Sequence, residues 1–409
     1  MIKHLIKKLN ILKINAKKNF SSIINTSSAT LKTKIKPNTE IPMEYRKYSQ
    51  KILNGSILAQ TIKEDLKQRL SLIISKYKLT QKPKLKIILI GERKDSRIYV
   101  ENKIKACKYI GVDSELKIFS ESVSLETIKD EVSYSNSDAN THGIIVQLPV
   151  PAALEAYKTE ILSKVAIEKD VDGLNPLNQG RILQMNLTKT LVPPTAVGVL
   201  ELLRLAIKFD NNIDNYINDY LLNFSFSEEE VDLSGLDVCV LGRGLTAGLP
   251  ISILMQKCNG TVTLCHSLSD KAKVDKKLWD ADIIISAVGK KNLLTAPQIK
   301  KDSIIIDVGI NVEIDPIKKV KKVCGDVDFD ACVEKAKFIT PVPGGVGKMT
   351  VVMLIKNVIK SWIIANNVDL NEINDMQNLC FGHHNLLQVD SEEIKDKIYE
   401  MKDKNTNYV

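Results

Sequence analysis

The sequence predicts an α/β protein built from two domains. From residue 52 onward, short apolar segments rich in β-branched residues alternate with helical patterns, which is typical of parallel strands covered by helices on both faces. The alternation stops at 167–194, a loop dense in Asp, Gly, Asn and Pro, and then starts again. A chain of 409 residues is long enough to bury two cores, so each run of alternation is expected to form its own domain.

The first domain is expected at 50–194, as a three-layer α/β domain. Its helices and strands are expected, in chain order, at 56–78, 85–90, 96–111, 114–120, 125–134, 143–148 and 152–165. Asp95 or Ser96 could cap the helix at 96–111.

The second domain is expected at 195–349, beginning with a helix at 195–208. Its strands are expected at 238–241, 261–265, 283–287 and 304–308. Residues 209–233 are largely polar and indicate a surface insertion of unknown role. A Gly-rich turn at 341–347 leads into a long apolar helix at 350–366, which is expected to pack back onto the first domain.

The two ends of the chain differ from the rest in composition. Residues 1–39 carry nine lysines and no acidic residue, and the apolar residues of this segment fall on one helical face at its start. This pattern indicates a mitochondrial presequence and linker over 1–45, and hence a matrix protein. The alternative is a basic tail on a cytoplasmic protein, since no arginine precedes Arg46. Residues 367–409 are charged and polar and predict an exposed tail.

Charge and composition exclude several classes of partner. Without the nine leading lysines the 58 basic residues fall to 49, which equals the number of acidic residues, so we expect no nucleic-acid partner. No apolar run reaches the roughly 18 to 20 residues of a membrane span. The seven cysteines and five histidines show no metal-ligand spacing, so no metal site is predicted.

A glycine-rich motif follows the first strand of the second domain. Residues 242–248 read GRGLTAG, which fits G-x-G-x-x-G/A between a strand and a helix. Glycines at these places let the main chain approach a pyrophosphate, and the helix N-terminus offers N–H groups to it. The motif favours a Rossmann-type dinucleotide-binding domain over a plain tight turn.

The next strand indicates which dinucleotide is used. An Asp or Glu at its end would bind the ribose 2′-hydroxyl of NAD, but this strand ends in Cys265, His266 and Ser267. Arg243 and Ser267 could bind a 2′-phosphate, which favours NADP and leaves NAD possible. The alternative is that His266 and Ser267 only cap the helix that follows.

In the first domain, Tyr99 and Lys103 lie four residues apart and share one face of a predicted helix. A lysine beside an aromatic ring at the edge of a cleft could stack a planar ligand and transfer a proton. The spacing alone is also that of an ordinary exposed pair.

Taken together, the motifs resemble the bifunctional methylenetetrahydrofolate dehydrogenase/methenyltetrahydrofolate cyclohydrolase family over residues 52–366. The matching segments are SRIYVENK at 96–103, VQLP at 146–149, KDVDG at 169–173, GRGLTAGLP at 242–250, TLCHS at 263–267, GDV at 325–327 and TPVPGGVG at 340–347.

The resemblance implies a folate cleft between the two domains and a role for each site residue. It implies that Lys103 is the catalytic lysine of the cyclohydrolase step, that Tyr99 stacks on the folate, that Gln147 tunes the lysine, and that Asp172 binds the pterin. It further implies folate contacts from Pro343, Gly344 and Gly345. The implied cofactor-binding residues are Gly242, Arg243, Gly244, Gly248, His266, Ser267 and Ile310.

The implied activity is oxidation of 5,10-methylenetetrahydrofolate with NADP, followed by hydrolysis of the methenyl product to 10-formyltetrahydrofolate. Its main rival is the mitochondrial subclass that uses NAD with magnesium and phosphate, where the family has an additional Arg at a place that holds Ser267 and Leu268 here. A Rossmann oxidoreductase acting on an amino or hydroxy acid, and a non-catalytic folate-binding protein, are remoter alternatives. The family also implies a homodimer.

Overall fold

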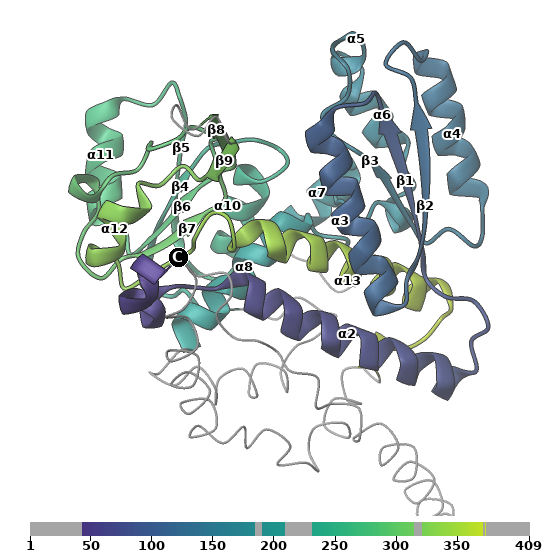
Figure 1. Cartoon of the computed structure of the whole chain (residues 1–409), viewed down its shortest axis with the longest axis horizontal. Helices are drawn as coiled ribbons and strands as arrows, with labels where there is room; N and C mark the ends of the chain where they lie inside the picture. Colours follow the sequence, from purple (N-terminus) through teal and green to yellow (C-terminus); the bar gives the residue numbers. More distant parts are fainter. Residues whose placement is uncertain (1–42, 185–189, 209–230, 315–320, 371–372, 374–409) are drawn as a thin grey trace, which may run out of the picture. The chain divides into compact units, whose positions relative to one another are not determined.

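The structure is a computed structural model that describes residues 43–184, 190–208, 231–314, 321–370 and 373 (Figure 1). Residues 1–42 of the predicted presequence and linker, most of the 209–233 insertion and almost all of the C-terminal tail lie outside the described residues. Helices and strands of the first part are η1 (Met43–Lys51), α2 (Gly55–Tyr77), β1 (Lys84–Ile90), α3 (Lys94–Ile110), β2 (Asp113–Phe119), α4 (Leu125–Ser137), β3 (Gly143–Val146), α5 (Ala152–Glu155), α6 (Lys158–Lys164), η2 (Ile167–Lys169) and α7 (Pro176–Leu183).

The second part begins with α8 and ends with α13. Its elements are α8 (Pro194–Lys208), β4 (Asp237–Leu241), α10 (Gly248–Lys257), β5 (Thr261–Cys265), α11 (Lys271–Asp280), β6 (Ile283–Ser286), η3 (Ala296–Gln298), β7 (Ile304–Asp307), β8 (Asn311–Ile314), β9 (Lys321–Cys324), α12 (Phe329–Lys335), β10 (Phe338–Ile339) and α13 (Val346–Ala365).

The first sheet has the strand order β2-β1-β3, and both pairings are parallel. The central strand β1 is buried on both faces because alternate residues point to opposite sides. Ile87 and Leu89 belong to the core formed with α2, α3 and α13, whereas Ile88 and Ile90 belong to the core formed with α4 and α6. This is the three-layer domain that the sequence predicts.

The second sheet is also parallel, with the order β10-β7-β6-β4-β5. Val238 and Val240 of β4 pack with α8 and α10, while Cys239 and Leu241 pack with α11 and α12 on the opposite face. Because all five strands run the same way, the loops that follow them gather at one edge. A Rossmann-type domain is therefore confirmed.

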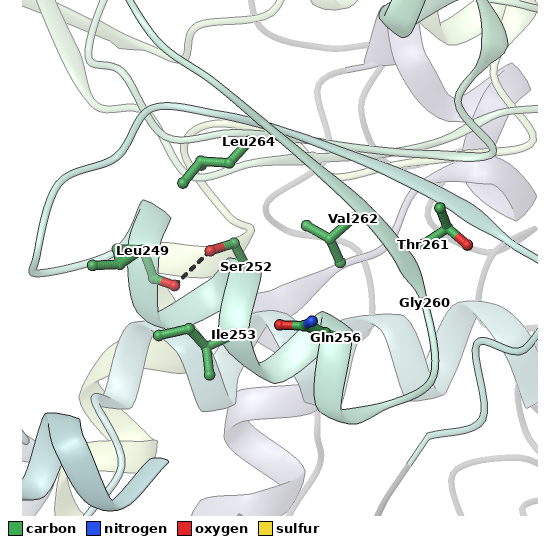
Figure 2. Close-up of a pocket in the computed structure, with 8 residues that line it drawn as sticks. All are labelled: Leu249, Ser252, Ile253, Gln256, Gly260, Thr261, Val262 and Leu264. Atoms are coloured by element: carbon green, nitrogen blue, oxygen red, sulfur yellow. Dashed lines mark hydrogen bonds between the residues drawn. The ribbon is translucent and has the colours of Figure 1, made fainter. Parts of the chain in front are cut away.

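Strand β5 is one of the two edge strands of this sheet, and a hollow lies beside it (Figure 2). Its volume is about 480 Å³. It is lined by Leu249, Ser252, Ile253, Gln256, Gly260, Thr261, Val262 and Leu264. None of the predicted site residues lines it, so it is no part of the candidate active site.

Helix α13 is buried along most of its length, and its polar side chains bind main-chain carbonyls of loops. Asn357 Nδ2 donates to the carbonyls of residues 171 and 192 at 2.9 and 2.8 Å, and Lys360 Nζ donates to that of residue 190 at 3.0 Å. Ser361 Oγ lies 2.6 Å from the carbonyl of residue 142. The helix packs on α2 and α3 of the first domain, as expected, and also on α8. In the described part of the chain, no helix has the length and apolar character needed to cross a membrane.

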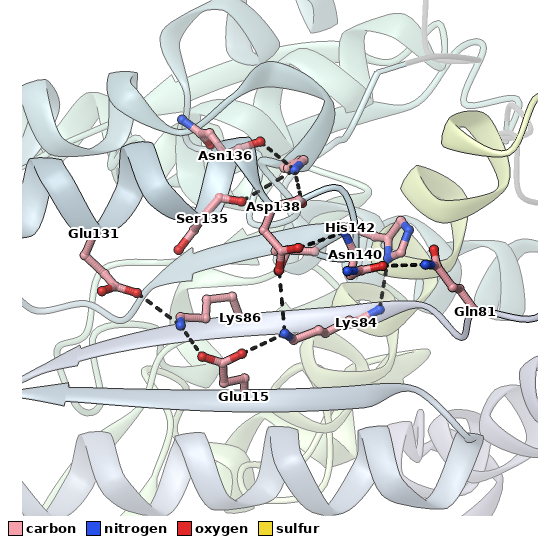
Figure 3. Close-up of polar contacts among 12 residues, drawn as sticks. Gln81, Lys84, Lys86, Glu115, Glu131, Ser135, Asn136, Asp138, Asn140 and His142 are labelled. Carbon is pink, nitrogen blue, oxygen red and sulfur yellow. Dashed lines mark hydrogen bonds and ion pairs between the residues drawn. The ribbon is translucent and has the colours of Figure 1, made fainter.

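The amino-terminal end of β1 carries a network of ion pairs (Figure 3). Lys84 Nζ lies 2.7 Å from Glu115 and 3.6 Å from Asp138, while Lys86 pairs with Glu115 and, at 3.1 Å, with Glu131. Burial disfavours the charge of Lys86, but its two carboxylate partners outweigh burial and raise the pKa of this lysine. Lys86 is therefore a charge-paired residue of the core and no candidate for proton transfer.

Several sequence predictions were wrong in detail. The helix expected at 152–165 is two short helices, α5 and α6, separated by a break. The loop expected at 167–194 contains α7, and the helix expected to start at 350 starts at Val346. The hairpin of β8 and β9 and the short α12 and β10 were not predicted, because none of them has a long periodic pattern.

Candidate active site

Within the described residues, Lys103 and Gln147 are the two predicted site residues that a side-chain hydrogen bond joins directly. Helix α3 buries Lys103 to 9% exposure, and its Nζ donates a hydrogen bond of 3.0 Å to Gln147 Oε1. Gln147 comes directly after β3, and its main-chain N–H extends the parallel pairing by donating to the carbonyl of Ile88. Its Nε2 donates to the carbonyl of Leu148 at 2.8 Å, so the amide oxygen is turned toward the lysine.

Tyr99 lies one turn before Lys103 on α3 and remains 40% exposed, which leaves its ring open to a ligand. Burial, and then the nearby Asp95, raise the pKa of the Tyr99 hydroxyl. The predicted cap of this helix was wrong, since α3 starts at Lys94 and its N-cap is Arg93. Asp95 is instead the ion-pair partner of Arg93, at 2.6 Å.

In the KDVDG segment at 169–173, three residues hold the local structure and one acidic residue is accessible to a ligand. Lys169 Nζ donates to main-chain carbonyls at the C-terminal end of α4, including two at 2.7 and 2.8 Å. Asp170 is buried and accepts two main-chain N–H groups before α7, and burial raises its pKa to about 6. Gly173 has a φ of +65°, and a Cβ there would lie 2.6 Å from the Pro193 nitrogen. Asp172 is partly exposed and forms no side-chain hydrogen bond within the described residues, so its carboxylate is available to a ligand.

The turn after β4 has the shape that a pyrophosphate requires. Gly242 has a φ of +100°, and a Cβ on it would collide with the carbonyl oxygen of Ala287. A Cβ on Gly248 would collide with the carbonyl of Gly242, so the start of α10 approaches the turn too closely for any other residue. Ala247, the N-cap of α10, offers no side-chain cap, the N–H of Leu249 donates to the carbonyl of Gly244, and Pro250 has no N–H. Among the first three residues of the helix, the N–H of Gly248 is therefore the one left for an anion. Gly244 has open space around it and is exposed, as is Arg243.

The turn after β5 holds His266 and Ser267 at the same edge of the sheet. His266 Nδ1 accepts the N–H of Leu268 at 3.3 Å, and Ser267 is exposed. Helix α11 is capped by Asp270, whose carboxylate accepts the N–H of Lys273 at 3.0 Å. The alternative that His266 and Ser267 only cap the next helix is therefore wrong.

The turn at 341–347 lies against the start of α2. The carbonyl of Gly344 accepts the N–H of Ser56 at 3.0 Å, and a Cβ on Gly55 would collide with the carbonyl of Gly345. Pro343 is exposed, Gly344 is partly exposed with a φ of +111°, and Gly345 is buried.

The candidate cofactor residues gather at the carboxyl edge of the second sheet, after β4, β5 and β7. Ile310 follows β7 and is 44% exposed, and its Cδ1 would lie 3.9 Å from a Cβ on Gly347. In the part of the chain that the structure describes, no hydrogen bond or ion pair joins the Lys103–Gln147 pair to these loops. Gln179 of α7 does reach the cofactor turn, since its Nε2 donates to the carbonyl of Leu245 at 3.0 Å.

Two buried acids at this edge were missed as site residues. Asp307 ends β7, and burial raises its pKa to about 7. Asp326 is fully buried after β9. The sequence offers one signal for each, a glycine at 309 and at 325 where a Cβ would collide with the other residue's carboxylate. Among the described residues, no group of three His, Cys, Asp or Glu side chains could hold a metal ion.

Comparison with known proteins assigns both halves of the chain. Residues 53–172 match the tetrahydrofolate dehydrogenase/cyclohydrolase catalytic domain, and residues 224–366 match the NAD(P)-binding domain of the same family. The bifunctional protein FolD of Nitratiruptor is 38% identical over 311 residues, which cover 76% of this chain and 97% of the relative. That of Rickettsia bellii is 38% identical over 316 residues, covering 76% and 98%.

Among solved structures, the methylenetetrahydrofolate dehydrogenase-cyclohydrolase of Trypanosoma brucei, complexed with NADP cofactor and inhibitor, is 34% identical with a TM-score of 0.68. The match covers 78% of this chain and 98% of that structure. The fold, the glycine turn at 242–248 and these matches agree, and the chain belongs to the tetrahydrofolate dehydrogenase/cyclohydrolase family.

Proposed function

We propose that this protein oxidises 5,10-methylenetetrahydrofolate with NADP and hydrolyses the methenyl product to 10-formyltetrahydrofolate. The observation that carries the proposal is the hydrogen bond from Lys103 to Gln147, in a chain that also builds a dinucleotide turn. Support comes from the FolD relatives, which are named bifunctional, and from the Trypanosoma brucei enzyme, which was solved with NADP.

For the oxidation, the chain binds and orients. NADP supplies the hydride acceptor when it is bound. Gly242, Gly248 and the N-terminus of α10 would hold its pyrophosphate, and Arg243 with Ser267 would hold its 2′-phosphate. The methenyl cation is stabilised by its own nitrogens, so this step needs positioning more than acid–base groups.

For the hydrolysis, Lys103 moves protons. Its neutral amine takes a proton from the water that attacks the methenyl carbon, and the ammonium then returns that proton to the ring nitrogen as the carbon–nitrogen bond breaks. The hydroxyl proton on the former methenyl carbon is released to solvent as the formyl C=O forms. Gln147 Oε1 keeps Nζ in place. Tyr99 would stack on the folate, and Asp172 would accept hydrogen bonds from the N–H groups of the pterin. The main chain of Pro343, Gly344 and Gly345 would contact the substrate.

The test is a Lys103→Gln variant of the full chain, with Lys105→Gln as its matched control. Lys105 lies on the same helix, is exposed and forms only a 4.0 Å ion pair with Glu101. Lys103→Gln is expected to reduce NADP and accumulate methenyltetrahydrofolate, whereas the control completes both steps. Normal hydrolysis by the Lys103→Gln variant would refute the proposed proton-transfer role of Lys103.

The cofactor is tested by following reduction of NADP and of NAD side by side, with and without magnesium and phosphate. NADP reduction independent of both ions is expected, because β5 ends at Cys265 and is followed by His266 and Ser267, with no carboxylate to repel a 2′-phosphate. Reduction of NAD alone, and only with the ions, would refute the choice of NADP and keep the family.

We also propose the division of the chain into a catalytic domain at 50–194, a cofactor domain at 195–349 and a polar tail at 367–409. Residues 1–45 are proposed as a mitochondrial presequence and linker, on the strength of their nine lysines and lack of acids before residue 40. A fusion of residues 1–45 to a fluorescent protein is expected to enter mitochondria. A fusion in which six of the lysines are replaced by glutamate should stay in the cytoplasm, and uptake of both fusions would argue against a presequence.

A homodimer is proposed from the family and from the position of β5 at the open side of the sheet. Sedimentation of the full chain is expected to give twice the mass of one chain. A Val262→Lys change on β5 should weaken the dimer, whereas Val312→Lys on β8, which is 58% exposed, should not. A monomeric wild-type protein would refute the proposal.

A further inference from the structure

Asp326 binds the loop that follows β6 from inside the protein. Its buried carboxylate accepts the three consecutive N–H groups of residues 288–290 at 2.8 to 3.1 Å. It also accepts hydrogen bonds from Ser286 Oγ at 3.0 Å and from Asn311 Nδ2 at 3.1 Å. Consecutive N–H groups that converge in this way form a site for an anion, and here the anion is a side chain of the protein.

The main chain of Asp326 binds the rest of the same loop. Its carbonyl accepts the N–H groups of Leu293 and Leu294 at 2.7 and 3.2 Å. Five N–H groups between residues 288 and 294 therefore end on this one residue. The shape of the loop depends on where Asp326 lies.

Asp307 fixes that position. Its carboxylate accepts the N–H groups of Asp326 and Val327 at 3.0 and 2.9 Å, and that of Gly309 at 3.0 Å. The N–H of Asp307 in turn donates to Thr340 Oγ1 at 2.7 Å, directly before the turn at 341–347. The two acids thus join the loops that follow β6, β7 and β10.

The loop held by Asp326 contacts the cofactor turn. Ala287, its first residue, places its carbonyl against Gly242 so closely that no Cβ fits between them. A shift of residues 287–290 would therefore be transmitted to the turn that is proposed to bind the pyrophosphate. The Lys103–Gln147 pair belongs to the other sheet and has no hydrogen bond to this network within the described residues.

We propose that Asp326 is a positioning residue of the dehydrogenase site, whose carboxylate holds residues 287–290 against the Gly242 turn and so sets dinucleotide affinity. The inference rests on the proposed function, because it assigns the turn to NADP. It separates the two activities, since loss of Asp326 impairs dinucleotide binding and leaves the hydrolysis of methenyltetrahydrofolate intact.

The test compares Asp326→Asn with Asp328→Asn in the full chain. Asparagine has the same size as aspartate, but one of its two terminal groups is an NH₂, which cannot accept a hydrogen bond. Whichever carboxylate oxygen the NH₂ replaces, it faces N–H or hydroxyl donors, so at least two hydrogen bonds are lost. Asp328 undergoes the same change two residues away, and asparagine can still cap α12 there.

Three measurements decide the outcome. Asp326→Asn is expected to raise the Kd for NADP, measured by calorimetry without folate, at least about tenfold. Amide hydrogen exchange at residues 288–290 should become faster, and hydrolysis of methenyltetrahydrofolate in the absence of NADP should stay within about twofold of wild type. Asp328→Asn should match wild type in all three.

Unchanged NADP affinity in a folded Asp326→Asn variant would overturn the proposal, as would an equal loss of both activities. If this variant does not fold, Ser286→Ala removes one donor to the same carboxylate and should give a smaller loss of NADP affinity in the same direction; no loss would overturn the proposal. A wild-type protein that neither binds nor reduces NADP would instead refute the proposed function.

Discussion

Replacing Gln147 by leucine should slow hydrolysis and leave oxidation nearly unchanged. Leucine keeps the approximate size but removes the oxygen that accepts Lys103 Nζ at 3.0 Å. Lys103 gains a positive charge as it takes the proton of the attacking water, and a hydrogen bond to a charged group contributes about 1.5 to 3 kcal/mol. The distance lies slightly beyond the usual range of charge-assisted bonds, so the lower end applies, about 1.5 kcal/mol or a roughly tenfold loss of kcat/KM for hydrolysis.

The assay follows the disappearance of methenyltetrahydrofolate and, separately, NADP reduction by the same preparation. Gln81→Leu is the matched control, because Gln81 precedes β1 and its side chain binds only Asn140 at the surface. Gln147→Glu adds a sharper comparison, since a carboxylate there would hold the positive charge on Lys103, and hydrolysis should then recover toward alkaline pH. Equal loss of both activities in Gln147→Leu, or no loss of hydrolysis, would refute the reasoning.

Three further predictions concern stability and cofactor choice. Gly248→Ala should lower stability by about 1 to 3 kcal/mol through its collision in the cofactor turn, whereas Gly244→Ala, with open space around it, should unfold like wild type in chemical denaturation. Burial lowers the pKa of His142 to about 4 from 6.5, so its neutral form stabilises the fold above pH 6.5 and this contribution is lost as the pH falls toward 4. His142 Nδ1 accepts the N–H of Lys84, and His142→Asn keeps an acceptor there. This variant should lose about 3 kcal/mol less of its free energy of unfolding than wild type when the pH falls from 6.5 to 4. Equal acid sensitivity of the two proteins would contradict the prediction. Arg243→Ala should raise KM for NADP about tenfold and leave KM for NAD unchanged, and a parallel rise in both would argue against a 2′-phosphate contact.

The sequence predicts the layers of this fold well, because they follow from local patterns. Strands such as β3 and β6 are short apolar runs between helices, and that pattern can be recognised in a single sequence. The start of α3 was misjudged because Asp95, a good capping residue by type, is used in an ion pair with Arg93. The break between α5 and α6 was missed because no proline or glycine marks it in the sequence.

The candidate site, like the fold, could be predicted from the sequence only in part. Tyr99 and Lys103 share a helical face by spacing alone, but no spacing relates Gln147, 44 residues further on, to the lysine. The family resemblance implies that contact, and the structure shows it as a hydrogen bond. In the motif GRGLTAG the sequence treats three glycines alike, whereas the structure shows that Gly242 and Gly248 are required by contacts within the chain and that Gly244 is not.

Asp307 and Asp326 show why part of the dinucleotide site is hard to find in a sequence. Proton transfer depends on the identity of a few side chains, and a lysine or a glutamine is visible as a letter. Dinucleotide binding depends on where main-chain loops lie, and the acids that hold those loops look like any exposed Asp until their donors are known. The sign of such acids in the sequence is a nearby glycine, here at 309 and 325. At these glycines the main chain comes within hydrogen-bond distance of a buried carboxylate, which leaves no room for a Cβ. An Asp within two residues of such a glycine is therefore better interpreted as an internal anion that shapes a binding loop than as a surface charge.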